Sequence, residues 1–339
     1  MGNTLRIGIM GFGHIGRHLY RLALDRDDTE VSVISDIAKP DILHYLLTCD
    51  RYNPTQVNLA GNYLEHSKFC TRILTGSTLR TIPWNRFNVD IVLDCTGRFN
   101  NREQMQTHLQ SGVRRVMIST LPTDEIDKVI LPGINESEIS VDDRLISAGS
   151  STTNALAILL KVLDEKLGID YANMVTLHAY TSDQSLQDCA GNDYRCSRSA
   201  AKNIIPNSNE SAYWVSKILP HFKGRLAGSA LNVPVQKGSL LDLTLVMKNA
   251  EHGVEQINQA MREGAQQYSN LIGLAKDPVV SSDIIGDRHS AVYDMGASIK
   301  AGQKMVKTLS WYDNGLSQAC RMMDVLNLYR NIDPQESAE

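Results

Sequence analysis

The feature that most constrains the fold is a glycine-rich turn between a short strand and a helix. Leu5–Met10 is an apolar run of strand length, residues 11–16 have the spacing G-x-G-x-x-G, and residues 17–24 have helical character. In this setting the glycines permit a tight turn, close approach of the backbone to a pyrophosphate, and close packing of helix on strand. The sequence therefore predicts that the chain begins with a dinucleotide-binding domain.

An acidic residue lies at the position that distinguishes NAD from NADP in such domains. A second strand is predicted over residues 30–34, and Asp36 lies about 20 residues beyond the last glycine of the turn. A carboxylate there bonds the adenosine ribose hydroxyls and repels a 2′-phosphate, so NAD is favoured over NADP. The alternative is that the glycines only make a tight turn, with no ligand. The expected cofactor contacts in this region are Gly11, Phe12, Gly13, His14, Ile15, Gly16 and Asp36.

Strands alternate with helices through the rest of the first half. Strand-like runs at residues 91–95, 115–119 and 128–131, with a helix over residues 102–111 capped by Gly112, predict a mainly parallel, doubly wound sheet. Ligands of such sheets lie at the carboxyl ends of strands. Further cofactor contacts are therefore expected where the first two of these strands end, at Thr96, Gly97 and Ser119.

The second half has longer alternating strands and fewer crossover helices. The strand-like runs are residues 174–181, 229–233, 240–246 and 305–312. We expect an α/β protein: a Rossmann-type NAD-binding domain over residues 1–150, and an α+β domain with a largely antiparallel sheet over residues 151–315. A last helix, about residues 316–330, is expected to pack back on the first domain. The long polar loop over residues 182–199 is either functional, or at an interface, or a solvated charged loop.

The boundary between the two predicted domains carries small polar residues. Residues 150–154 read Ser-Ser-Thr-Thr-Asn and lead into an apolar helix predicted over residues 155–167. A helix N-terminus presents unpaired backbone N–H groups and a positive dipole end, which stabilise an anionic nucleophile or an oxyanion. The same residues also fit a helix N-cap with no further role.

The composition argues against several classes of partner, namely nucleic acid, membranes and metal ions. A net charge of −4 gives no long-range attraction to nucleic acid or to anionic membranes, and no apolar run reaches the length of a membrane span. The N-terminal residues do not resemble a signal peptide, so we expect a cytoplasmic protein with reduced thiols. The six cysteines are scattered and lack metal-ligand spacing, so no metal site is expected.

Motifs along nearly the whole chain resemble the phosphorylating glyceraldehyde-3-phosphate dehydrogenase family, which includes the erythrose-4-phosphate dehydrogenases. They are Gly-Phe-Gly-His-Ile-Gly-Arg at 11–17, Asp-Cys-Thr-Gly at 94–97, Ser-Ser-Thr-Thr-Asn at 150–154, His-Ala-Tyr-Thr at 178–181, Ile-Ile-Pro at 204–206 and Trp-Tyr-Asp-Asn at 311–314. The resemblance implies one NAD per subunit, a sugar-phosphate substrate, and a homotetramer in which the long loop packs near a neighbour's cofactor site.

The resemblance also implies a mechanism that this sequence does not fully support. In the family a cysteine thiolate attacks the aldehyde, a histidine acts as the base, and phosphate cleaves the resulting thioester. Here the histidine is kept as His178, whose alternative role is a structural hydrogen bond. The cysteine is replaced by Ser151, and Ala155 occupies the family's second cysteine position. A serine hydroxyl is essentially un-ionised near neutral pH.

The expected anion sites depart from the family as well. Asn232 replaces a family arginine, and Asn209-Glu210 replaces a Thr-Gly pair, so a carboxylate stands where phosphate is expected. Asn314 is kept where the family contacts nicotinamide, but Gly315-Leu316-Ser317 replaces Glu-Trp-Gly after it. The expected substrate and anion positions are Ser150, Thr152, Thr181, Asp183, Arg195, Asn209, Glu210 and Asn232.

Three hypotheses follow. In the first, the protein binds NAD but its dehydrogenase reaction is weak or lost, and it serves in binding, assembly or regulation as a pseudoenzyme with a sugar phosphate or no small-molecule substrate. In the second, it is an active NAD-dependent aldehyde oxidoreductase with an altered substrate. In the third, it is an ordinary glycolytic enzyme in which the catalytic cysteine was changed to Ser151 by engineering. Departures at several independent positions favour the first.

Overall fold

The computed structural model describes residues 4–50, 54–76, 82–182, 184–191 and 193–333, and the chain forms two compact units. Unit 1 comprises the chain up to residue 131, residues 135–149, and the chain from residue 318 onward. Unit 2 comprises residues 132–134 and 150–317. Among the described residues, no helix combines the length and apolar character that a membrane crossing requires.

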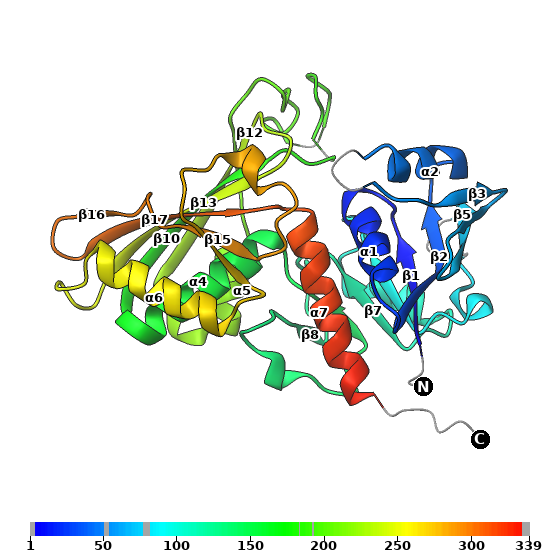
Figure 1. Cartoon of the computed structure of the whole chain (residues 1–339), viewed down its shortest axis with the longest axis horizontal. Coiled ribbons are helices and arrows are strands. Elements are labelled where there is room, and N and C mark those ends of the chain that lie inside the picture. Colours follow the sequence, from blue (N-terminus) through cyan, green and yellow to red (C-terminus); the bar gives the residue numbers. More distant parts are fainter. Residues whose placement is uncertain (1–3, 51–53, 77–81, 183, 192, 334–339) are drawn as a thin grey trace. The chain divides into compact units, whose positions relative to one another are not determined.

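Unit 1 is built on a nine-stranded sheet with the order β3-β4-β5-β2-β1-β6-β7-β9-β8 (Figure 1). From β5 to β8 every neighbouring pair is parallel, while β3, β4 and β5 form an antiparallel edge. Parallel neighbours of this order require crossover connections between the strands, which is the arrangement of a Rossmann-type, doubly wound sheet. The predicted fold class of this unit is confirmed. The strands are β1 (Leu5–Met10), β2 (Thr29–Asp36), β3 (Asn58–Ala60), β4 (Tyr63–Glu65), β5 (Cys70–Thr75), β6 (Ile91–Asp94), β7 (Arg115–Ile118), β8 (Lys128–Val129) and β9 (Leu145–Ser147).

The helices of unit 1 connect these strands. They are α1 (His14–Leu24), α2 (Pro40–Thr48), η2 (Trp84–Phe87), α3 (Arg102–Leu109) and η3 (Glu136–Glu138), joined by the part of α7 (Leu316–Ile332) from residue 318 onward. The predicted end of α3 was wrong: Gln110 is its C-cap, and Gly112, with φ of +87°, follows two residues later. The reason is a tight turn in which the Gly112 N–H donates to the carbonyl oxygen of Leu109, so the chain has left the helix before the glycine.

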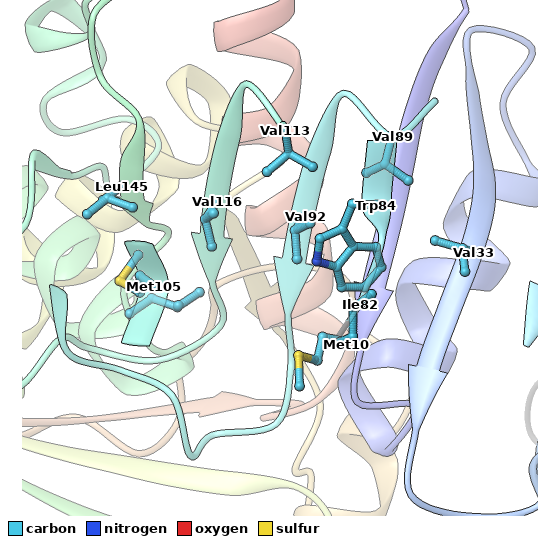
Figure 2. Close-up of a cluster of buried hydrophobic side chains, with 11 residues drawn as sticks. Met10, Val33, Ile82, Trp84, Val89, Val92, Met105, Val113, Val116 and Leu145 are labelled. Atoms are coloured by element: carbon cyan, nitrogen blue, oxygen red, sulfur yellow. The ribbon is translucent and has the colours of Figure 1, made fainter. Parts of the chain in front are cut away.

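The core of unit 1 surrounds the central strands. Figure 2 shows Trp84 lying among side chains from β1, β2, β6 and β7, and its indole is fully buried. A β-carbon on Gly8 of β1 would lie 2.8 Å from two atoms of the Trp84 ring. Gly8 therefore makes room for the largest side chain of this core, and the two positions are coupled by packing.

Unit 2 is built on an eight-stranded sheet with the order β11-β12-β10-β13-β17-β15-β14, and β16 pairs with β17. Its long central ladders, β10 with β13 and β13 with β17, are antiparallel, as predicted for a largely antiparallel sheet. Alternate residues of β13 are buried, the pattern of a sheet with one face on the core. The strands are β10 (Ile169–Ala179), β11 (Ile205–Asn207), β12 (Leu226–Val233), β13 (Ser239–Met247), β14 (Ile272–Ala275), β15 (Ala291–Asp294), β16 (Ile299–Ala301) and β17 (Met305–Tyr312).

One long helix covers the core of unit 2. α4 (Ser151–Leu167) contacts β10, β13 and β15, and α5 (Ser211–Ile218) and α6 (Val254–Gln267) pack beside it (Figure 1). Short η4 (Pro220–Phe222) and η5 (Ser281–Ile284) complete the helices of this unit in the described residues. The predicted helix start at residue 155 was wrong, because the Ser150 hydroxyl accepts from the Thr153 N–H and so begins the helix at Ser151.

Gly8→Ala is expected to destabilise unit 1, because the added methyl group meets the Trp84 ring and overpacking of a core costs about 1–3 kcal/mol. Urea unfolding followed by tryptophan fluorescence measures the change. Gly296→Ala is the control, since a β-carbon there would find its nearest neighbour, Asp294 Oδ1, at 3.7 Å. Equal stability of the two variants would contradict this account of the core.

Candidate active site

The β1–α1 turn places its glycines in distinct environments. Gly11 has φ of +85°, and a β-carbon on it would lie 3.0 Å from the Thr96 N and Cγ2 atoms. A β-carbon on Gly16 would lie 2.3 Å from the carbonyl oxygen of Gly11, so α1 approaches the turn as closely as a backbone can. At Gly13 a β-carbon would meet nothing within 4 Å. The first and last glycines are required by the protein itself, whereas the space over the middle one suits a pyrophosphate.

The N-terminus of α1 is suited to an anion. Its N-cap is Gly13, which has no side chain to bond the first N–H groups of the helix. His14 and Ile15 are the first helical residues, and His14 Nε2 lies 3.1 Å from His18 Nε2. Uncapped N–H groups and the helix dipole together favour a bound phosphate.

Asp36 ends β2 beside this turn. Its Oδ2 accepts from the Phe12 N–H at 2.7 Å, and its Oδ1 accepts from the Ala38 N–H at 2.9 Å. Phe12 is buried edge-on against Tyr20, with ring centroids 5.7 Å apart. The carboxylate is thus held at the carboxyl end of β2, the position from which it meets a ribose.

The carboxyl ends of β6 and β7 border the same turn. The Cys95 N–H donates to the Met10 carbonyl oxygen at 2.7 Å, and the Ser119 N–H donates to the Asp94 carbonyl oxygen at 3.0 Å. Thr96 lies against Gly11, and Gly97 follows with φ of +67°. The structure therefore brings the predicted cofactor residues of unit 1 together at one sheet edge.

In unit 2, Ser151 is the first residue of α4. It is buried, with 7% of its surface exposed, and Ser150 is the N-cap. The Ser150 and Thr153 hydroxyls lie 2.7 Å apart, and the Thr153 hydroxyl donates to Ser211 Oγ at 2.9 Å. Residue 151 is thus fixed at a helix N-terminus, where an anionic atom is stabilised.

A buried tyrosine connects the start of α4 to β10. The Tyr312 hydroxyl lies 2.8 Å from Thr152 Oγ1 and 2.7 Å from Thr176 Oγ1. Its ring lies edge-on to that of His178, with centroids 6.2 Å apart. Burial raises the pKa of Tyr312, and its hydrogen bonds to the threonines oppose the rise. Tyr312 stays protonated and places Thr152, the neighbour of Ser151, on the same side of β10 as His178.

His178 is held in one tautomer by the backbone. Its Nδ1 lies 2.6 Å from the carbonyl oxygen of Ala179, so in the neutral ring Nδ1 carries the proton and Nε2 is the basic nitrogen. The parallel register of β10 and β12 places Asn232, which is buried, directly beside His178. An amide therefore stands at the strand position next to the candidate base.

Asn209 and Glu210 lie at the N-terminus of α5. Asn209 Oδ1 accepts from the Ser211 N–H at 2.8 Å, and the Ser211 hydroxyl bonds that of Thr153. The N-termini of α4 and α5 are therefore joined by side chains. Glu210 is the N-cap of α5, exposed, and its side chain makes no capping bond. A carboxylate at this position complements the helix dipole itself and disfavours a second anion.

The other predicted substrate residues are not brought to this cluster by any contact described. Thr181 is exposed, and its N–H donates to Gln184 Oε1. Arg195 is exposed in the polar loop, with its N–H bonded to Asp193 Oδ1. Asp183 lies outside the described residues. Asn314, predicted to contact the nicotinamide of the cofactor, comes just before α7, and its buried Oδ1 accepts no hydrogen bond from the described residues.

Sequence reasoning missed the residues that hold the site. Thr176 was considered only as part of a strand, Tyr312 only as part of a strand and of a family motif, and Ser211 was not considered. A signal was present in β17, where the buried alternate positions Thr308, Ser310 and Tyr312 all carry hydroxyls. A strand that turns hydroxyl groups inward indicates a buried polar network.

Known proteins match the chain over both units. The family model of the glyceraldehyde 3-phosphate dehydrogenase NAD binding domain matches residues 5–102, and that of the C-terminal domain matches residues 150–314. Glyceraldehyde-3-phosphate dehydrogenase 1 of Bacillus subtilis (strain 168) is 36% identical over 327 residues, which cover 95% of this chain and 97% of that protein. The Mycobacterium avium glyceraldehyde-3-phosphate dehydrogenase is 38% identical over 338 residues, covering 96% and 98%.

The chain belongs to the glyceraldehyde-3-phosphate dehydrogenase family. Membership confirms the predicted family, the predicted fold class and NAD as the cofactor. The residues fit that cofactor, since the space over Gly13 and the uncapped start of α1 suit its pyrophosphate and Asp36 suits its ribose.

Gly13→Ala is expected to weaken NAD binding by at least about tenfold without lowering the melting temperature, because the methyl group fills only the space of the pyrophosphate. Gly16→Ala is the contrasting variant. Its methyl group meets the Gly11 carbonyl oxygen, so both affinity and melting temperature should fall. Calorimetric titration with NAD and thermal unfolding without it separate the two. Undiminished affinity in Gly13→Ala would contradict the predicted position of the pyrophosphate.

Proposed function

We propose that this protein is an NAD-binding member of the glyceraldehyde-3-phosphate dehydrogenase family in which phosphorylating aldehyde oxidation is weak or lost. The single observation that carries the proposal is the serine at position 151, on the first turn of α4. Its position at a helix N-terminus favours an anion, yet the residue itself does not supply one near neutral pH.

The chemistry depends on the nucleophile. A thiolate is a strong nucleophile and a good leaving group, and the thioester it forms reacts readily with phosphate. A serine needs a base to remove its proton as it attacks, and it gives a less reactive ester. Cys95 offers no replacement, because burial, followed by the nearby Asp94, raises the pKa of its thiol well above the usual value.

The phosphate side of the reaction is also weakened. Asn232 offers an amide beside His178 where the resemblance implies a permanent positive charge. Glu210 adds a negative charge at the N-terminus of α5, which is joined to that of α4 through Ser211 and Thr153. Both changes lower the affinity for a phosphate group.

A second candidate function is an NAD-dependent aldehyde oxidoreductase with an altered substrate. The observation that favours it is the fixed tautomer of His178, which keeps Nε2 basic. NAD, when bound, accepts a hydride; the protein's part would be to remove a proton from a hydrated aldehyde or an alcohol at His178. NADH formation that does not depend on phosphate and is lost in His178→Asn would support this function.

We further propose a cytoplasmic homotetramer. The support in the structure is the exposure of apolar side chains in and beside the polar loop of unit 2: Leu186 is 56% exposed, Tyr194 96% and Ile204 66%. Large apolar side chains of this kind are typical of a surface that a partner covers.

The catalytic proposal is tested by NADH absorbance with NAD, phosphate and glyceraldehyde 3-phosphate or erythrose 4-phosphate. The protein is expected to show little or no activity because of Ser151, and Ser151→Cys to show little because Asn232 and Glu210 remain. The combined variant with Ser151→Cys, Asn209→Thr, Glu210→Gly and Asn232→Arg is the positive control, and should exceed Ser151→Cys by more than about tenfold.

Other outcomes discriminate between the hypotheses. Activity in the unchanged protein would refute the argument from serine. Recovery of activity in Ser151→Cys alone would favour an ordinary enzyme altered at one position. Absence of NAD binding in a calorimetric titration would remove the cofactor assignment itself.

Light scattering coupled to gel filtration tests the oligomeric state, with a tetramer as the expected result. Leu186→Asp combined with Tyr194→Asp is expected to shift the mass toward smaller species, because charges are costly to bury in an interface. A monomer in the unchanged protein would contradict the proposed assembly.

A further inference from the structure

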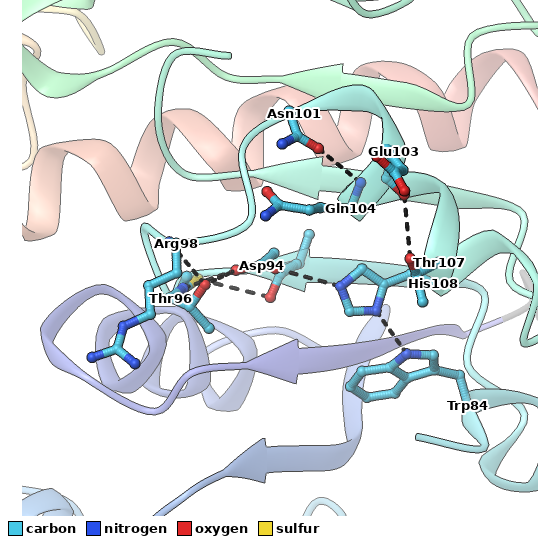
Figure 3. Close-up of polar contacts among 11 residues, drawn as sticks. Trp84, Asp94, Thr96, Arg98, Asn101, Glu103, Gln104, Thr107 and His108 are labelled. Carbon is cyan, nitrogen blue, oxygen red and sulfur yellow. Dashed lines mark hydrogen bonds and ion pairs between the residues drawn. The ribbon is translucent and has the colours of Figure 1, made fainter. Parts of the chain in front are cut away.

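The cofactor edge of unit 1 rests on a chain of buried polar side chains. Asp94, His108 and Trp84 are 2%, 0% and 0% exposed, and they come from β6, α3 and η2. Figure 3 shows the chain running from the Trp84 indole through the His108 ring and the Asp94 carboxylate to Thr96. None of these buried side chains has a place in the family chemistry described above.

The hydrogen bonds between these side chains are all donated in one direction, from Trp84 to His108 and from His108 to Asp94. The Trp84 Nε1–H donates to His108 Nδ1 at 3.0 Å, so Nδ1 carries no proton. The proton of the neutral ring is then on Nε2, which lies 3.4 Å from Asp94 Oδ2, a long hydrogen bond. Trp84 therefore selects the tautomer in which His108 donates to Asp94.

This series of hydrogen bonds ends at the turn over residues 96–98, which borders the cofactor site of unit 1. Asp94 Oδ1 accepts from the Thr96 N–H at 2.9 Å and from the Thr96 hydroxyl at 2.7 Å. Thr96 Oγ1 in turn accepts from the Arg98 N–H at 3.2 Å, which folds the chain around Gly97. The same Thr96 lies against Gly11, within 3.0 Å of where a β-carbon would stand. Movement of Thr96 would thus reach the dinucleotide turn directly.

We propose that Asp94, oriented by His108 and Trp84, is a positioning residue for NAD: it fixes the turn over residues 96–98 against the glycine-rich turn. The inference rests on the NAD site of unit 1 and adds to it the residues that hold its edge. Positioning by such outer contacts governs affinity because a site must be held within a fraction of an ångström of its binding geometry.

Asp94→Asn is the sharpest test, because it is isosteric and changes only hydrogen-bond direction. Its amide oxygen can still accept from Thr96, but its NH2 group then faces the donating His108 Nε2. His108 cannot reverse its tautomer while Trp84 donates to Nδ1. The variant is expected to bind NAD about tenfold more weakly by calorimetry, since a buried donor is left unsatisfied.

A second substitution should restore what the first removes. Trp84→Phe deletes the indole donor, so His108 is free to carry its proton on Nδ1 and accept from the amide at Nε2. The double variant of Asp94→Asn with Trp84→Phe is therefore expected to bind NAD more tightly than Asp94→Asn alone, even though the smaller ring lowers its melting temperature. A purely structural role predicts the opposite order, because the two losses would add.

Controls separate affinity from folding. Asp143→Asn alters another buried carboxylate of unit 1, which bonds the Tyr329 hydroxyl, and should lower the melting temperature with unchanged NAD affinity. Should Asp94→Asn fail to fold, His108→Gln and His108→Leu replace it, because a glutamine amide can both donate to Asp94 and accept from Trp84. His108→Gln should keep the affinity and His108→Leu should lose it.

Unchanged NAD affinity in Asp94→Asn, or equal affinity in His108→Gln and His108→Leu, would overturn the proposal while leaving the cofactor site intact. No binding of NAD by the unchanged protein would overturn both the site and the proposal.

Discussion

The Gly11 carbonyl oxygen lies 2.3 Å from where a β-carbon on Gly16 would stand, and this close approach of α1 to the end of β1 is the constraint on which the cofactor edge of unit 1 depends. Because α1 is held so close to the sheet, its uncapped N-terminus lies at the carboxyl edge of the strands. Asp36, Thr96 and Ser119 end or follow the neighbouring strands at that same edge. A dinucleotide site results from backbone geometry before any side chain contributes specificity.

Unit 2 also places a helix N-terminus at its candidate site, at the start of α4. Here the helix N-terminus is capped by Ser150, and the residue it presents is a side-chain hydroxyl, Ser151. The immediate surroundings of residue 151 still suit an anion, with a buried position, a helix dipole and a histidine of fixed tautomer nearby, whereas Asn232 and Glu210 weaken the phosphate side. The proposal of weak or lost dehydrogenase activity follows from the changed nucleophile together with these changes at the anion positions.

Buried hydroxyls and rings hold both sites from behind. Tyr312 joins α4 to β10 through Thr152 and Thr176, and the chain from Trp84 to Thr96 joins α3 and η2 to the end of β6. In each case the links are directional hydrogen bonds among side chains that are mostly buried, so the geometry admits few alternatives. Such networks give a site its precision at the cost of tolerating little change in donor and acceptor pattern.

The sequence by itself determined the elements whose signals are local. The glycine spacing before a helix, the acid after the second strand and the run of small polar residues at 150–154 predicted the dinucleotide turn, NAD and the start of α4 to within a few residues. These features depend on backbone conformation and helix capping, which neighbouring residues decide. The departures from the family could also be recognised in the sequence, because each is a change of side-chain chemistry at one position.

Only the tertiary structure decided which distant residues support the sites. Tyr312 is 160 positions from Thr152, and no periodicity relates them. Asn232 became the neighbour of His178 through the register of two parallel strands, and His108 reached Asp94 through the packing of α3 on the sheet. A buried Tyr, Trp or His in a sequence has the pattern of ordinary core, because burial depends on apolar surface. The partner of its one polar atom is chosen by the fold.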